Sequence, residues 1–211
     1  MTNTQSLSVD KLTYSYQHKP ILRNLSFALC QGQGLLVQGE NGSGKSTLLK
    51  ILSGLLLPDN GMLSWSGQAI ADSENKLRFK KSMGFLGHKD GLKGSLSILE
   101  NLKFSLQLHN IVLPENTNEV LTRLGLQSQQ ENLVSSLSFG QKRKTALARL
   151  ILMQKSLWLL DEPFAGLDKS STEYIKQILK NHIKTKGMVI LTHHGKLELD
   201  MPLAQLNLVG Y

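Results

Sequence analysis

Residues 39–47 read Gly-Glu-Asn-Gly-Ser-Gly-Lys-Ser-Thr, and this stretch decides the fold. It satisfies the pattern G-x-x-x-x-G-K-[ST] of a phosphate-binding loop, which has meaning only between a strand and a helix. Both neighbours are predicted, because the apolar run 35–38 resembles a buried strand and residues 46–54 have helical spacing of leucines. The glycines let the backbone N–H groups turn toward phosphate oxygens, and the positive helix end adds to the attraction.

This loop supplies the first candidate binding residues. Lys45 would reach the β- and γ-phosphates of a nucleotide, and the Ser46 hydroxyl would ligate Mg²⁺. The other expected nucleotide-binding residues of the loop are Gly39, Asn41, Gly42, Ser43, Gly44 and Thr47. An ordinary glycine-rich turn is the alternative, and the strand and helix on either side disfavour it.

Two adjacent carboxylates follow the apolar run 157–160, which is predicted to be a buried strand. Beside a phosphate loop, Asp161 fits a Mg²⁺ ligand at the C-terminal end of a strand. Glu162 can then face the attacking water as general base. Without the phosphate loop, the same pair would be interpreted as ordinary surface residues at the end of a strand.

The order of the remaining elements predicts an α/β fold. Apolar faces of helical spacing run from residue 98 to 152, followed by the strand 157–160, a helix over 170–184 and a strand over 188–191. This order predicts a parallel core sheet with a helical insertion. Trp65, Trp158 and Cys30 are expected to be buried in it.

Composition bounds the classes of protein. A chain of 211 residues suits one α/β domain, and no run of 18 apolar residues would cross a membrane. Residues 1–10 lack the features of a secretory signal, and one cysteine allows no intrachain disulfide, so a cytosolic setting is expected. The net charge of +8 leaves a nucleic-acid or membrane-surface partner open.

Residues 137–141 read Leu-Ser-Phe-Gly-Gln and precede a predicted helix that Ser138 can cap. They resemble the LSGGQ signature of the ATP-binding-cassette (ABC) ATPases, with Phe139 in place of the first glycine. The resemblance implies a head-to-tail homodimer, in which Ser138, Gly140 and Gln141 contact the ATP bound by the other subunit. The basic run 142–144 of this helix is interpreted either as a solvated face or as a contact to nucleotide or partner.

Three other features of the ABC family occur at the expected distances from these motifs. Tyr16, rather than Tyr14, stands where the family stacks an aromatic ring on adenine. Residues 165–168 match the loop that communicates between subunits. His194, preferred over His193, stands at the place of the switch histidine that contacts the γ-phosphate.

His88 stands where the family usually has a glutamine that senses Mg²⁺ and the membrane partner, and a neutral imidazole could also bind metal. Together with the segments 91–93, 99–102 and 146–150, it resembles the CcmA-type ATP-binding proteins of cytochrome c biogenesis, the haem exporter family.

This resemblance implies one ABC ATPase domain over residues 1–211. Residues 1–87 and 153–211, approximately, would form the P-loop core with an antiparallel β subdomain, and about 88–152 the helical subdomain. Implied partners are integral membrane subunits of the CcmB/CcmC type, at the cytoplasmic face of the inner membrane. Without a haem-binding motif in the sequence, direct haem binding is not expected, and neither is nucleic acid.

Three alternatives remain for the function. The chain can serve an ABC transporter of another small substrate, which co-purified partners would reveal. It can act on DNA or the ribosome, which the +8 charge favours, although a single cassette without a heptad insertion argues against it. It can bind nucleotide without hydrolysis, against which Lys45, Asp161 and Glu162 argue.

Overall fold

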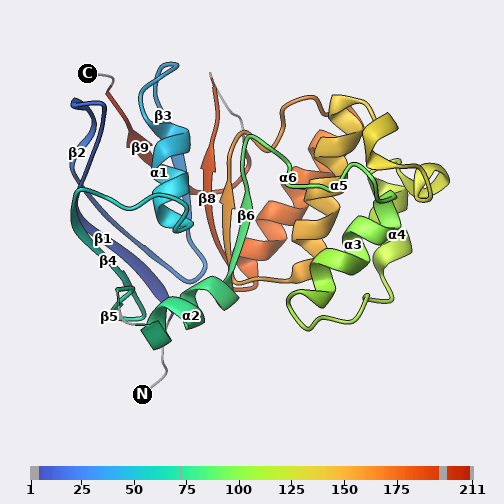
Figure 1. Ribbon diagram of the computed structural model, residues 1–211, viewed down its shortest axis with the longest axis horizontal. Coiled ribbons are helices and arrows are strands. Elements are labelled where there is room, and N and C mark those ends of the chain that lie inside the picture. The colour runs from blue at the N-terminus through green and yellow to red at the C-terminus, as the bar shows by residue number, and fades with distance from the viewer. Residues whose placement is uncertain (1–4, 72, 195–198, 210–211) are drawn as a thin grey trace.

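The computed structural model describes residues 5–71, 73–194 and 199–209. Figure 1 shows an antiparallel sheet at one end, a parallel sheet in the middle and a group of helices at the other end. The α/β fold expected from the sequence is therefore confirmed, with its parallel core sheet, antiparallel sheet and helical part.

The antiparallel sheet has the strand order β2-β1-β4-β5. Its strands are β1 (Ser6–Tyr16), β2 (Lys19–Cys30), β4 (Asn60–Trp65) and β5 (Gln68–Ala69). The β1–β2 hairpin turns on Gln17 and His18, which both have positive φ, as the twist of a two-residue hairpin requires. Trp65 is buried as expected, but Cys30 is exposed. The expectation for Cys30 was wrong because side chains alternate along β2, and the buried position there is Leu29.

The parallel sheet has the strand order β6-β7-β8-β3-β9. Its strands are β3 (Gly34–Gln38), β6 (Met83–Leu86), β7 (Leu157–Leu160), β8 (Met188–Thr192) and β9 (Leu203–Asn207). Successive residues of these strands pack into hydrophobic cores on opposite faces of the sheet, as expected for strands that are buried on both faces. Val37, Leu159 and Ile190 pack toward the antiparallel sheet, whereas the residues beside them, such as Leu160, pack toward the helices.

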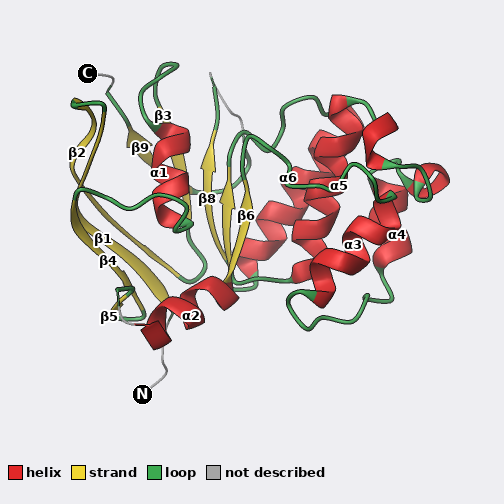
Figure 2. Ribbon diagram, viewed as in Figure 1, coloured by secondary structure: helices red, strands yellow, loops and turns green. Residues whose placement is uncertain are grey.

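Figure 2 shows most of the helices gathered on the side of the parallel sheet that faces away from the antiparallel sheet. The helices are α1 (Lys45–Leu52), α2 (Ser73–Ser82), α3 (Ile98–Gln107), α4 (Thr117–Arg123), α5 (Phe139–Met153) and α6 (Lys169–Lys184), with 3-10 turns at Gln127–Gln129 and Val134–Ser136. Within the described ranges, no helix is long and apolar enough to cross a membrane.

The strands predicted around the phosphate loop and the acidic pair are present, as are the helices that become α1 and α6. Strand β9 was missed, because its half-exposed residues carry no strong apolar pattern. It pairs in parallel with β3 and leads into Leu208, which packs beside the phosphate loop. The last part of the chain thus supports the loop that the sequence identified first.

Candidate nucleotide site

Three neighbouring strands end at the same edge of the parallel sheet, and each is followed by candidate site residues. Strand β3 leads into the phosphate loop 39–47, β7 leads into Asp161 and Glu162, and β8 leads into the two histidines 193–194. Because β7 and β3 both pair with β8 in parallel register, these residues come together in space. This edge is where ligands bind in open α/β sheets.

The shape of the phosphate loop depends on glycines at two close approaches. A Cβ atom on Gly39 would lie 2.4 Å from the Ser43 Oγ atom and 2.5 Å from the Leu208 carbonyl oxygen. At Gly44, where φ is +98°, it would lie 2.8 Å from a methyl carbon of Ile21. A side chain at either place would push the loop out of shape.

The inside of the loop suits an anion. The Nζ atom of Lys45 is buried and donates to the carbonyl oxygens of Gly39 and Glu40, at 2.7 and 2.8 Å. Helix α1 begins after Gly44 without a side-chain cap, so its first-turn N–H groups are available to a ligand. The Ser43 Oγ atom is buried and has no hydrogen-bond partner among the described residues.

A hollow of about 190 Å³ joins the phosphate loop to the residues after β7 and β8. Its lining is Ile21, Asn41, Gly42, Gly44, Lys45, Ser46, Thr47, Glu162 and His194. The Nε2 atom of His194 contacts the Oε1 atom of Glu162 directly. The loop, the carboxylate and the histidine predicted to act on phosphate therefore face one space.

Asp161 lies behind this hollow rather than in its lining. Its side chain is buried, and its Oδ1 atom accepts a hydrogen bond of 2.8 Å from the Thr192 hydroxyl. The same Thr192 oxygen accepts from the backbone N–H of Glu162 at 2.9 Å. Carboxylate and hydroxyl oxygens are donors that Mg²⁺ prefers, so Asp161 and Ser46 fit that ion by their chemistry.

The side chains of the basic run 142–144 lie in different environments. Arg143 is 2% exposed, so of the two interpretations the solvated face is wrong at this position. Its guanidinium donates to the Gly87 carbonyl oxygen at 2.8 Å, the Asp90 carboxylate at 2.9 Å, and the carbonyl oxygens of Asp161 and Glu162. These contacts fix the backbone of both carboxylate residues to α5. Sequence reasoning missed this residue because its neighbours Lys142 and Lys144 are charged as well.

The two candidate switch histidines lie differently. His193 packs edge-on against Phe164, with ring centroids 6.1 Å apart, and does not line the hollow. Burial lowers the pKa of His193, while the nearby Glu162 carboxylate raises it and His194 lowers it further. His194 lines the hollow, so the structure favours it over His193 for a phosphate contact.

The signature segment lies away from the hollow of its own chain. The Ser138 hydroxyl caps α5 by accepting from the Gln141 N–H, and the Gln141 side chain accepts from the Ser138 N–H at 2.7 Å. A Cβ atom on Gly140 would lie 2.4 Å from the Gly166 carbonyl oxygen, so the two loops touch through glycines. Phe139 is 56% exposed.

Two other predicted site residues stay at the surface. Tyr16 ends β1 and is 60% exposed, and His88 is exposed in the loop after β6. Neither residue lines the hollow. A metal contact through His88 stays a prediction.

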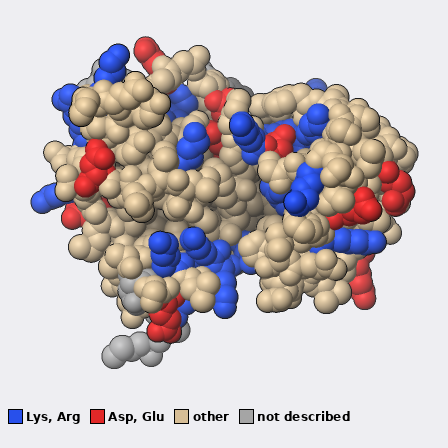
Figure 3. Space-filling model, in the orientation of Figure 1, with Lys and Arg blue, Asp and Glu red and all other residues tan. Residues whose placement is uncertain are grey.

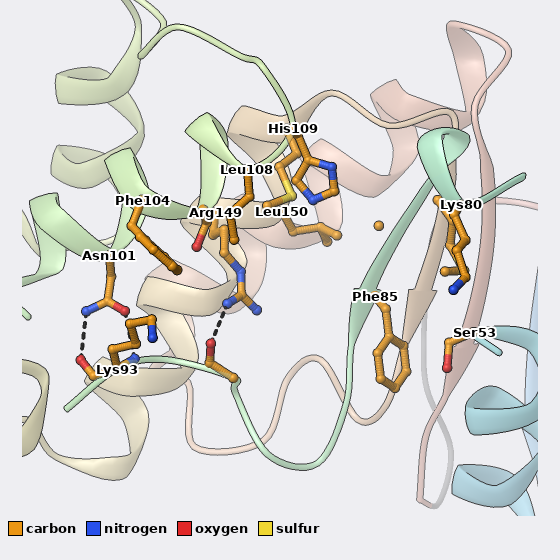
Figure 4. Close-up of a pocket in the computed structure, with 15 residues that line it drawn as sticks. Ser53, Lys80, Phe85, Lys93, Asn101, Phe104, Leu108, His109, Arg149 and Leu150 are labelled. Carbon is orange, nitrogen blue, oxygen red and sulfur yellow. Dashed lines mark hydrogen bonds between the residues drawn. The ribbon is translucent and has the colours of Figure 1, made fainter. Parts of the chain in front are cut away.

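A second hollow, of about 400 Å³, lies between the core and the helical part. Figure 4 shows Lys80, Phe85, Phe104 and Arg149 around it, contributed by α2, β6, α3 and α5 respectively. Of the described residues that line it, none is acidic. Burial lowers the pKa of Arg149, which donates to the carbonyl oxygens of Asp90 and Gly91. This groove thus has apolar walls and basic groups.

Comparison with known proteins agrees with this geometry. The family model for ABC transporters matches residues 22–165. A cytochrome c biogenesis ATP-binding export protein CcmA from Vibrio vulnificus is 38% identical over 197 residues, which are 93% of this chain and 95% of the relative. The protein of that name from Xylella fastidiosa is 41% identical over 96% of this chain and 93% of its own length.

Solved structures have the same fold. An ABC transporter ATP-binding protein from Pyrococcus furiosus is 25% identical, with a TM-score of 0.81 over 96% of this chain and 97% of its own. A bacterial Atm1-family exporter with ATP bound superposes with a TM-score of 0.79 over 92% of this chain and 35% of its own, at 20% identity, and supports the fold alone. The chain belongs to the ABC transporter family, as an ATP-binding, ATP-hydrolysing protein similar to CcmA.

Proposed function

We propose that this chain is the ATPase subunit of a membrane ABC complex for cytochrome c maturation, which couples ATP hydrolysis to haem export or to release of a haem-loaded chaperone. One observation carries the ATPase part, namely the hollow in which the phosphate loop meets Glu162 and His194. The cytochrome c part rests on the relatives that carry the name CcmA and match nearly the whole chain.

Each side chain of the site has a role in hydrolysis. Lys45 offsets the charge that develops on the β- and γ-phosphates, and Glu162 accepts a proton from the attacking water. His194, which contacts the Glu162 carboxylate, orients the γ-phosphate. Ser46 and Asp161 would hold Mg²⁺, joined by His88 after a movement of its loop, and the bound ion neutralises phosphate charge. The exposed Tyr16 would stack on the adenine.

The site is completed by a second copy of the chain. In a head-to-tail homodimer, Ser138, Gly140 and Gln141 of one subunit would contact the γ-phosphate bound by the other. The exposure of Phe139 and the distance of this segment from its own hollow support the arrangement. ATP would then hold the dimer closed, and hydrolysis would release it.

The groove between the core and the helical part is our candidate surface for the membrane subunits. Its walls expose apolar atoms of Phe104 and Leu108, while Lys80, Lys93 and Arg149 supply positive charge. An amphipathic segment with a carboxylate would satisfy both features. The loop that carries His88 connects β6 to this groove, so partner movement can reach the nucleotide site through it.

The charge of the chain fits a place beside a membrane. Figure 3 shows basic side chains gathered over α2, which carries Lys76, Arg78, Lys80 and Lys81. Anionic headgroups of the cytoplasmic leaflet attract such clusters. We therefore place the subunit on the cytoplasmic face of the inner membrane, bound through CcmB/CcmC-type partners.

The test is isolation of the intact membrane complex, with ATP hydrolysis measured with and without haem-loaded chaperone. The proposal predicts co-purification with CcmB/CcmC-type subunits and a change of hydrolysis rate with the chaperone. Hydrolysis without any response to the chaperone would refute the cytochrome c role and favour the alternative, an ATPase subunit for another small substrate.

A further inference from the structure

Arg143 is where three separate segments meet in the interior. It projects from α5, the helix that begins at the signature segment. Its Nη1 atom donates to Gly87 and Asp90 in the loop after β6, and its Nη2 atom donates to the carbonyl oxygens of Asp161 and Glu162 after β7. One side chain therefore ties the signature helix to the groove loop and to the backbone of the proposed general base.

The backbone of Glu162 has a conformation that needs such support. Its φ is +49°, in the left-handed region that non-glycine residues rarely adopt and that costs free energy. Both sides of the residue are held: its N–H donates to the Thr192 hydroxyl, and its carbonyl accepts from Arg143 at 2.9 Å. In this conformation the Glu162 side chain lines the phosphate hollow.

The chemistry of these contacts requires a guanidinium. Four oxygen acceptors from two loops lie around the planar fork of Arg143, and the fork can serve them together from one fixed orientation. A lysine ammonium has the same charge but is a single point on a flexible stem. The Nε atom of Arg143 is buried without a partner among the described residues, a cost that the other four contacts offset.

From these contacts we infer that Arg143 is a positioning residue for the reaction, which holds the Glu162 peptide in its left-handed conformation so that the carboxylate faces the phosphates. Asp90, whose side chain is 12% exposed, orients the guanidinium from the other side. This inference rests on the proposed ATPase function, because it assigns a role in the same site.

The test measures steady-state ATP hydrolysis by the full-length Arg143→Lys variant. The expected result is a kcat lower by roughly 10- to 100-fold with KM for ATP within about twofold, because a displaced base slows chemistry while the phosphate loop stays intact. Arg123→Lys, the same substitution at an exposed arginine of α4, is the matched control, and its kcat should equal that of the wild type. An unchanged kcat in Arg143→Lys would overturn the inference.

A cycle with Glu162→Gln separates positioning from general structural damage. Because Arg143 acts through the Glu162 carboxylate, Arg143→Lys should not lower the residual single-turnover rate of Glu162→Gln any further. Full additivity of the two losses would overturn the inference. If Arg143→Lys does not fold, the isosteric Asp90→Asn carries the test, with a smaller expected kcat loss of about threefold or more and KM unchanged. An unchanged kcat there would overturn it as well.

Different results would refute the proposed ATPase function and the role of Arg143. No ATP hydrolysis by the wild type, alone or with its membrane partners, would refute the proposed function and this inference together. Normal hydrolysis by the wild type with unaffected variants would refute the role of Arg143 alone.

Discussion

The starts of α1 and α5 are two helix N-termini that handle their free N–H groups in opposite ways. Helix α1 begins after Gly44, which offers no side-chain cap, and its first turn opens toward the hollow that Lys45 lines. Helix α5 begins at Ser138, whose hydroxyl and backbone form a reciprocal capping box with Gln141. Both segments are predicted to bind ATP phosphates, the first in its own subunit and the second in the partner, but at the second the capping box already uses the N–H groups of Ser138 and Gln141.

This difference indicates a division of labour. The uncapped start of α1 can bind an anion without any rearrangement. At α5, a phosphate would compete with the capping box for the Ser138 hydroxyl and for two N–H groups, so we expect a smaller contribution to binding, which depends on a close approach of the second subunit. The open site would bind ATP, and the capped site would respond to it.

The largest expected effect is at the open site. Lys45→Met removes the buried ammonium from the phosphate loop and should weaken ATP binding roughly 100-fold or more, because the described lining of the hollow contains no other lysine and no arginine. Equilibrium titration with ATP measures it. Lys50→Met, at the exposed end of the same helix, is the matched control and should bind as the wild type does. Equal binding by both variants would remove the distinction between the two helix starts.

An intermediate effect is expected at the capped site. Ser138→Ala removes the cap and should lower the free energy of unfolding by about 1 kcal/mol, as measured by urea denaturation. Ser138→Asp keeps a good cap but places a negative charge where the partner's γ-phosphate would lie. It should fold as stably as the wild type and yet fail to form the ATP-dependent dimer. Normal dimerisation of Ser138→Asp would count against the contact in trans.

The smallest effect concerns the start of α6, beside the signature helix. The hydrogen bond from Lys144 and those from the Ser171 backbone and Ser170 hydroxyl hold the pKa of Asp168 well below its usual range. A lowered folded-state pKa contributes stability above the unfolded pKa near 4, and this stability is lost as the pH falls. Asp168→Asn keeps the cap, so at pH 7 its stability should fall by less than about 1 kcal/mol, since the Asp168 side chain is half-exposed.

Urea denaturation at pH 7 and pH 3 checks this expectation. The stability difference between wild type and Asp168→Asn should shrink at pH 3, where the wild-type carboxylate is losing its advantage. A difference that grows on acidification would contradict the sign of the pKa shift.

What can be predicted from the sequence depends on how far apart in the chain the interacting residues are. The phosphate loop and the strand before Asp161 follow from local spacing, and the structure brings Lys45, Glu162 and His194 to one hollow. The role of Arg143 could not be predicted, because it depends on contacts to Gly87, 56 residues away in the chain. Strand β9 was also missed, since an edge strand with a half-exposed face gives only a weak pattern.

We propose that ATP is hydrolysed in the hollow between the phosphate loop, Glu162 and His194. The most direct measurement compares ATP turnover and nucleotide-dependent dimerisation for the wild type and Glu162→Gln. Glu162→Gln should lose turnover but still bind ATP and accumulate as an ATP-bound dimer, because the general base is gone while the phosphate contacts remain. Full ATPase activity in Glu162→Gln would contradict it.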